Sequence, residues 1–97
     1  MTIGIKEYKF KKWIVKTLKE DGYDVQIIMD VNSVYDVIAL KVHSVRLIQA
    51  KTCKKGAEAV MKRELKAFRE YRDRLPMMAS LEVWVKEDRK EVLVGVV

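Results

Sequence analysis

Three polar residues in the middle of the chain, Asp36, Gln49 and Lys51, have the types and spacing that phosphodiester chemistry requires. Asp36 interrupts the apolar run over residues 34–40, where a buried carboxylate is costly and needs a partner. Gln49 and Lys51 are two residues apart, so in a strand both side chains leave the same face of the sheet. A tight hairpin would bring Asp36 close to Gln49. We therefore expect a carboxylate, an amide oxygen and an ammonium group to converge at one edge of a sheet.

These groups suit a divalent cation, Mg²⁺ (or Mn²⁺). Magnesium prefers oxygen ligands and usually takes only one or two carboxylates, with waters and substrate phosphate in the remaining positions. Asp36 would hold the ion, and the Gln49 amide oxygen and the Ala50 main-chain carbonyl would complete the ligands from the protein. The ion would lower the pKa of a bound water and neutralise charge on a phosphodiester. Lys51 would orient that water or stabilise the pentavalent phosphate.

A structural ion pair is the competing interpretation of the same residues. Asp36 and Lys51 on adjacent strands would then neutralise each other and do no chemistry. Other chemistry has little support, because the chain has one histidine and one cysteine. These numbers exclude an internal disulfide and a cysteine-based zinc cluster.

The elements that must position the three residues follow from hydrophobic periodicity. Apolar residues about every four positions, with Trp13 beside them on the same core face, predict a helix over residues 5–21. A second helix over residues 57–74 ends before Pro76. Alternating or continuous apolar residues predict strands over residues 24–29, 34–42, 45–51, 81–86 and 91–97. The first three strands should form an antiparallel meander, and the crossover through the second helix should return the fourth strand parallel to an earlier one. The expected fold is α/β, in the order αβββαββ, with a mixed central sheet flanked by helices.

Length and composition predict one soluble domain over residues 1–97, since domains commonly have about 100–150 residues. The hydrophobic content of 49% excludes a disordered tail, and no apolar run approaches the roughly 18 residues of a membrane-spanning helix. Residues 1–12 alternate between apolar and charged, unlike a signal peptide. We expect a cytoplasmic protein that has no membrane partner.

The net charge of +6 favours an anionic partner, with nucleic acid the first candidate. A basic stripe on the first helix contains Lys9, Lys12 and Lys16, although such a stripe is most often a solvated helix face. A second group follows the strand of Gln49 and Lys51, where it could bind phosphates beside the one attacked. This second group consists of Thr52, Lys54, Lys55 and Lys62.

The order of these motifs resembles the PD-(D/E)xK nuclease signature, an aspartate followed on the next strand by an [E/D/Q]-x-K triplet. Asp36, twelve intervening residues and then the triplet over 49–51 match it. Residues 12–25 resemble the first helix and the start of the first strand in archaeal Holliday-junction resolvases. Residues 36–40 resemble their strand of aspartate, two hydrophobic residues and alanine, and residues 65–86 resemble their next segment.

The resemblance implies a restriction-endonuclease-like fold and a magnesium-dependent endodeoxyribonuclease that acts on branched or double-stranded DNA as a homodimer. Gln49 replaces the usual glutamate, and Lys11 aligns with a helix glutamate of the resolvases. Glu7, one turn earlier, is then the candidate for the fourth active-site residue. These departures leave open a second hypothesis, a nuclease-fold DNA-binding module that is catalytically weak or inactive. A third is a small α/β interaction protein whose charge serves solubility.

Overall fold

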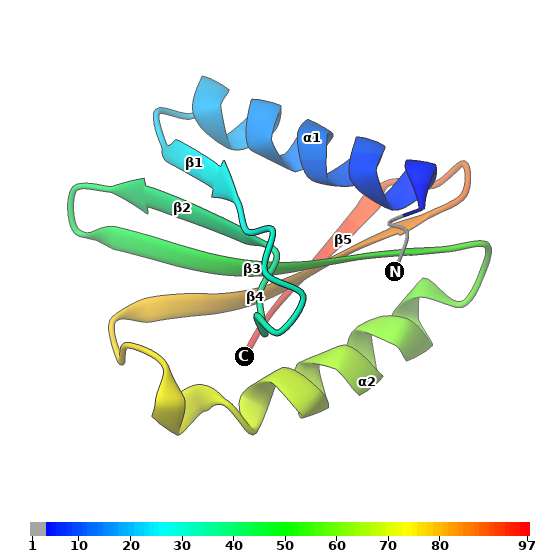
Figure 1. Cartoon of the computed structure of the whole chain (residues 1–97). Coiled ribbons are helices and arrows are strands. Elements are labelled where there is room, and N and C mark those ends of the chain that lie inside the picture. The colour runs from blue at the N-terminus through cyan, green and yellow to red at the C-terminus, as the bar shows by residue number, and fades with distance from the viewer. Residues whose placement is uncertain (1–3) are drawn as a thin grey trace.

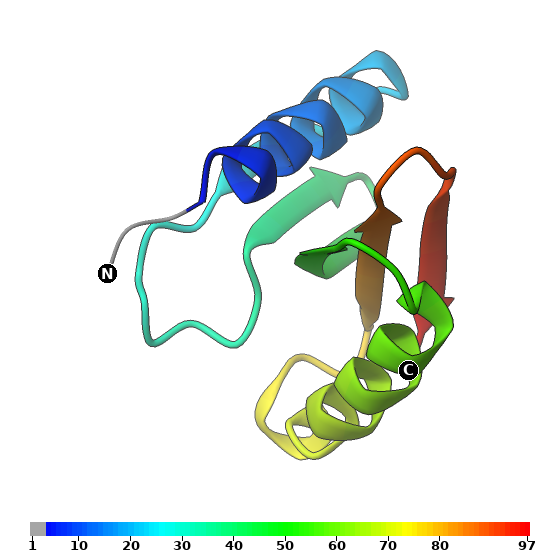
Figure 2. The ribbon, with the colours of Figure 1, turned by 90° about the vertical axis from the view of Figure 1, so that its right-hand side faces the viewer.

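The computed structural model describes residues 4–97, which form a five-stranded sheet with one α-helix on each face (Figure 1). The elements are α1 (Ile5–Glu20), β1 (Asp24–Ile27), β2 (Val37–Lys41), β3 (Ser44–Cys53), α2 (Ala57–Arg69), the 3₁₀ turn η1 (Arg72–Arg74), β4 (Ala79–Glu87) and β5 (Val92–Val96). A view turned by 90° shows α1 and α2 on opposite sides of the sheet (Figure 2). The predicted α/β fold and its element order are confirmed.

The strands lie in sequence order, β1-β2-β3-β4-β5, so β3 is central and β1 and β5 are the edges. The pairs β1–β2, β2–β3 and β4–β5 are antiparallel, while β3 and β4 are parallel. The predicted meander and the parallel return through α2 are both present. Because β3 joins the two halves of the sheet, residues at its C-terminal end lie close to both helices and to the β4–β5 hairpin.

Alternation along the strands divides the core into two clusters, one under each helix. Ile48 and Ala50 of β3 face α1, whereas Leu47 faces α2. The α1 cluster also contains Phe10, Ile14, Leu18, Val25, Val37, Ala39 and Trp84. The α2 cluster also contains Ala57, Phe68, Ala79, Leu81, Val83 and Val85.

Helix α1 buries one face against the sheet, and its buried residues include the charged Lys11. The helix ends where Gly22 adopts a left-handed conformation (φ 90°) and its N–H donates to the Lys19 carbonyl, as expected for a glycine that terminates a helix. Neither α-helix in residues 4–97 has the length and hydrophobicity needed to cross a bilayer.

Most predicted boundaries shift by one or two residues, and two need a larger correction. The second strand begins at Val37 and not at residue 34, because Asp36 marks a change in the pairing with β3. Helix α2 ends at Arg69, and the chain then continues through η1 before Pro76. Trp13, which we predicted on the core face of the first helix, is 47% exposed at the margin of the core.

Candidate functional site

Asp36 lies immediately before β2, at the point where this strand separates from β3. Its N–H donates to the Ile48 carbonyl (2.8 Å), and its carbonyl accepts from the N–H of Ile28 (2.7 Å). Val37 is also the partner of Ile48 in the strand register, so two residues face one, which is the pattern of a β-bulge. Bulges turn a side chain away from its regular direction. Asp36 is therefore not inside a strand buried on both faces, as we predicted, and its side chain is 26% exposed.

Both carboxylate oxygens of Asp36 have partners. Oδ2 accepts a hydrogen bond from the main-chain N–H of Ala50 (2.8 Å), so the side chain takes the place of a main-chain carbonyl from β2. Oδ1 lies 3.4 Å from Nζ of Lys11 on α1. The sequence led us to consider an ion pair with Lys51. The structure instead places Lys11, a residue of the N-terminal helix α1, against Asp36.

Lys11 is only 6% exposed, which is unusual for a lysine and explains why it needs an acidic partner. We did not predict its contact with Asp36. A signal was nevertheless present, because Lys11, Ile14 and Leu18 are separated by three and four residues and thus share the buried face of a helix. A lysine at a core position predicts a carboxylate opposite it.

Gln49 and Lys51 alternate with Ile48 and Ala50 along β3 and therefore share one face of the sheet, as predicted. This is the face toward α2, since Leu47 belongs to the α2 cluster while Ala50 belongs to the α1 cluster. The Gln49 Oε1 atom is buried and has no hydrogen-bond partner within residues 4–97. Within residues 4–97, neither Gln49 nor Lys51 forms a side-chain hydrogen bond or ion pair with Asp36.

Comparison with known proteins identifies the architecture that holds these residues. No family model matches the sequence, and no curated protein matches it. Among solved structures, the chain is similar to Archaeoglobus fulgidus Hjc, a Holliday junction resolvase from an archaeal hyperthermophile, with a TM-score of 0.69 and 16% sequence identity. The match covers 94% of this chain and 72% of that one. The chain has a resolvase-like fold. The restriction-endonuclease-like α/β architecture implied by the sequence motifs is thus confirmed.

Within this resolvase-like fold, the residues around Asp36 do not fit a divalent metal ion. Both Asp36 oxygens already have donors, and one of these donors is the buried ammonium of Lys11. A cation bound at Asp36 would lie beside this ammonium. Two unit positive charges about 4 Å apart repel each other by about 4 kcal/mol at an effective dielectric constant of about 20, and a divalent ion doubles this repulsion. Gln49 adds no negative charge to offset this repulsion. Residues 4–97 contain no group of three or more His, Cys, Asp or Glu side chains that could hold a metal.

Glu7, the predicted fourth member of the site, lies in the first turn of α1, four residues before Lys11. This spacing places both side chains on the same side of the helix. Within the described part of the chain, Glu7 forms no side-chain hydrogen bond or ion pair, whereas Lys11 reaches Asp36. The helix therefore brings a lysine to the aspartate, and a contact of Glu7 with this site stays a prediction.

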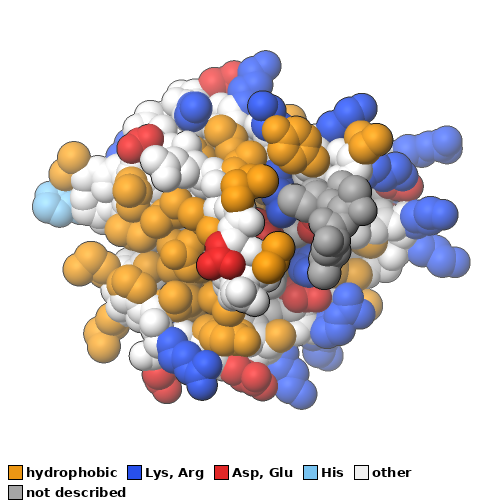
Figure 3. All heavy atoms as spheres, viewed as in Figure 1, with side chains coloured by type: hydrophobic (Ala, Val, Ile, Leu, Met, Phe, Trp, Pro, Cys, Tyr) orange, Lys and Arg blue, Asp and Glu red, His pale blue; other side chains and the backbone are white. Residues whose placement is uncertain are grey.

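Basic side chains gather at one end of the resolvase-like fold, over the N-terminal part of α1, the β3–α2 loop and the β4–β5 turn (Figure 3). Six of the predicted DNA-binding residues are exposed, and Thr52 is partly buried. The exposed ones are Lys9, Lys12, Lys16, Lys54, Lys55 and Lys62. Three further basic residues, distant in sequence from the others, were not predicted for this surface: Lys86 near the end of β4, and Arg89 and Lys90 in the β4–β5 turn.

Glu87 connects this basic turn to α2. Its Oε1 accepts a hydrogen bond from the main-chain N–H of Ala57 (3.0 Å) at the N-terminus of α2, and its Oε2 lies 2.9 Å from Nζ of Lys90. Lys90 and the Ala57 N–H lower the pKa of Glu87, and Glu87 in turn raises the pKa of Lys90. The charged forms of both groups are favoured, so the β4–β5 turn and the start of α2 are held together beside the lysines of the β3–α2 loop.

Proposed function

We propose that this chain binds branched or double-stranded DNA through a resolvase-like nuclease fold in which Lys11 takes the place of a metal ion at Asp36. The observation that carries the proposal is the 3.4 Å contact between the buried Lys11 ammonium and the Asp36 carboxylate. A lysine at this position supplies the positive charge that a cation would otherwise supply. The site would then be structural, and DNA binding would not depend on Mg²⁺ or Mn²⁺.

The basic end of the molecule supports nucleic acid as the partner. The protein carries a net charge of +6, and Lys54 and Lys55 stand exposed in the loop that follows β3. Lysines that contact phosphates give affinity that does not depend on base sequence and that falls steeply with salt. We propose a single domain that acts as a homodimer, supported by the exposed apolar residues Val94 and Val96 on the edge strand β5.

Replacing Lys54 and Lys55 with alanine is expected to weaken binding to a four-way junction and to duplex DNA. Each lost phosphate contact should reduce the slope of log affinity against log salt by about 0.9. Fluorescence anisotropy with labelled DNA over a series of salt concentrations measures this slope. The matched control replaces Lys19 and Lys66, which are exposed near the other ends of the two helices and change the net charge equally. Equal slopes for the two double variants would contradict the assignment of the β3–α2 loop.

A second candidate function is the endonuclease implied by the sequence resemblance. It is favoured by the buried Gln49 Oε1, because a buried acceptor without a donor is costly and invites a ligand. Incubation of the protein with junction, flap and linear duplex DNA in the presence of Mg²⁺ or Mn²⁺ distinguishes the two functions. We expect DNA binding without cutting. Cutting by the wild-type protein that is abolished in both Asp36→Ala and Lys51→Ala would establish the enzyme and overturn the structural role of Lys11.

A further inference from the structure

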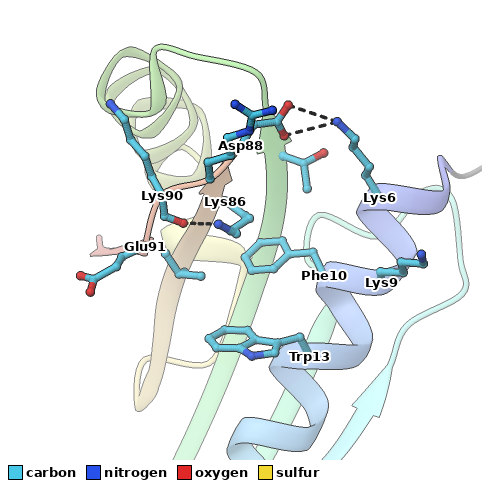
Figure 4. A pocket seen from close by; sticks show the side chains of 11 residues that line it. Lys6, Lys9, Phe10, Trp13, Lys86, Asp88, Lys90 and Glu91 are labelled. Atoms are coloured by element: carbon cyan, nitrogen blue, oxygen red, sulfur yellow. Dashed lines mark hydrogen bonds and ion pairs between the residues drawn. The ribbon is translucent and has the colours of Figure 1, made fainter.

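A groove of about 920 Å³ lies between the N-terminal half of α1 and the β4–β5 hairpin, apart from the Asp36 site (Figure 4). Phe10 and Trp13 from α1 and Val92 from β5 form its apolar part. The groove exists because α1 packs over β1 to β3 and leaves this end of the β4–β5 hairpin uncovered. In Figure 4 the rings of Phe10 and Trp13 point from the helix toward the hairpin.

Trp13 presents a fixed aromatic ring to this groove. Its ring is stacked on that of Phe10, with centroids 6.1 Å apart and planes inclined by 20°. It also meets the buried Trp84 edge-on, with centroids 6.3 Å apart. These contacts orient the indole while 47% of the residue remains exposed. A rigid, half-exposed indole costs little conformational entropy when a flat ligand stacks on it.

The groove is basic as well as aromatic. Five basic and two acidic side chains line it, and one of the acidic ones, Asp88, is paired with Lys6 across the groove (3.1 Å). The ammonium of Lys86 donates hydrogen bonds to the main-chain carbonyls of Glu87 and Lys90. Lys9 has no acidic partner within residues 4–97. An aromatic surface flanked by cations is the combination that proteins use for single-stranded nucleic acid, in which bases stack and phosphates meet lysines.

We propose that this groove binds an unpaired nucleotide of the DNA, with the base against Trp13 and the phosphate near Lys9 and Arg89. The inference rests on the proposed DNA binding and adds a substrate class to it, namely DNA with a single-stranded segment such as an overhang, a flap or an opened junction. Stacking on an indole tolerates every base, so the preference would be for unpaired over paired DNA and not for a sequence.

The test compares three DNA duplexes: blunt, with a short overhang, and with the same overhang made abasic. The abasic overhang keeps the phosphates and removes the bases. We expect the wild-type protein to bind the ordinary overhang roughly 5- to 150-fold more tightly than the abasic one, which corresponds to the usual effect of one stacked base. Trp13→Leu should lose this ratio and keep its affinity for the blunt duplex, whereas Trp13→Phe should retain most of the ratio.

A second measurement needs no change at Trp13. Binding of the ordinary overhang should quench tryptophan fluorescence more than binding of the abasic one, since Trp84 is buried and Trp13 is half exposed. Equal affinity of the wild-type protein for the two overhangs, with duplex binding intact, would overturn the inference and leave the proposed function standing. A change of oligomeric state in Trp13→Leu without any effect of bases would assign the groove to a second copy and also overturn it. A protein that binds none of the three duplexes fails the proposed function itself.

Discussion

Replacing Lys11 with glutamate is expected to change the Asp36 site from an ion pair into a pair of carboxylates that binds Mn²⁺ or Mg²⁺. Without metal, the variant should lose about 3 kcal/mol of stability, because a pair with one deeply buried member is replaced by like charges. Addition of the metal should restore stability, by about 2.7 kcal/mol at a concentration one hundred times the dissociation constant. Thermal unfolding with and without Mn²⁺ measures both effects.

The matched control is Lys12→Glu, which makes the same charge change on an exposed neighbour and should show neither effect. Lys11→Met separates the loss of the ion pair from the gain of a carboxylate, since it should destabilise the protein without creating metal dependence. A Lys11→Glu protein that is as stable as the wild type and indifferent to Mn²⁺ would show that Lys11 does not hold the Asp36 site. Metal-dependent DNA cutting by Lys11→Glu alone would identify Lys11 as the residue that keeps a nuclease fold inactive.

The fold was predictable because its signals are local. Apolar spacing in α1 and α2 and alternation in the strands follow from which face of each element is buried, and each signal lies within a few residues. Asp36 was detectable for the same reason, since a carboxylate in an apolar run contradicts its surroundings. The strand boundary at Val37 was not detectable, because it depends on a bulge, and the bulge depends on the bonds of Asp36 to Ile48 and Ala50.

The core position of Lys11 predicts that it meets a carboxylate, but which carboxylate it meets, and where the aromatic groove lies, could not be predicted, because both depend on how α1 lies across the sheet. Sequence spacing points to a partner for Asp36 on the adjacent strand, at Lys51. Lys11 reaches it from a helix, across the separation between α1 and β2. Similarly, helical spacing placed Trp13 near the core, but its exposure is decided by where the edge of the helix falls relative to β4 and β5. Tertiary placement, and not composition, distinguishes the buried Trp84 from the half-exposed Trp13.

The same dependence on placement gives Lys11 a structural meaning beyond the site. A buried lysine is tolerated only where its ammonium meets the carboxylate, so the pair favours one position of α1 along the sheet. The Asp36 carboxylate in turn accepts a hydrogen bond from the main-chain N–H of Ala50 in the central strand β3. Helix α1, the bulge and β3 are therefore linked through a single side chain, which is why a change at Lys11 should affect both stability and the chemistry available to the site.

Glu82→Gln is expected to be the most destabilising conservative change in the other half of the sheet. Glu82 on β4 is 3% exposed and receives two hydrogen bonds of 2.7 Å from Arg46 on β3 and one of 3.0 Å from the indole of Trp84. Arg46 also lies over the rings of Tyr23 and Trp84. Neutralising Glu82 leaves the Arg46 charge without compensation, which should cost about 3 kcal/mol. For a chain of this size that is a fall of roughly 12–24 °C in melting temperature.

The effect should depend on pH in a direction that the network determines. Burial by itself raises the pKa of Glu82, but the hydrogen bonds from Arg46 and Trp84 outweigh burial and lower the pKa overall. With the folded pKa below the unfolded value of about 4.3, the stabilisation is complete above that pH and is lost as the pH falls toward the folded pKa. The difference in urea stability between the wild type and Glu82→Gln should therefore be largest near neutral pH and shrink as the pH falls below the unfolded pKa of about 4.3. Glu91→Gln, at an exposed position, is the control and should change stability by less than about 0.5 kcal/mol. A difference between wild type and Glu82→Gln that is constant over this pH range would mean that Arg46 does not lower the pKa of Glu82, and that its role in joining β3 to β4 is packing alone.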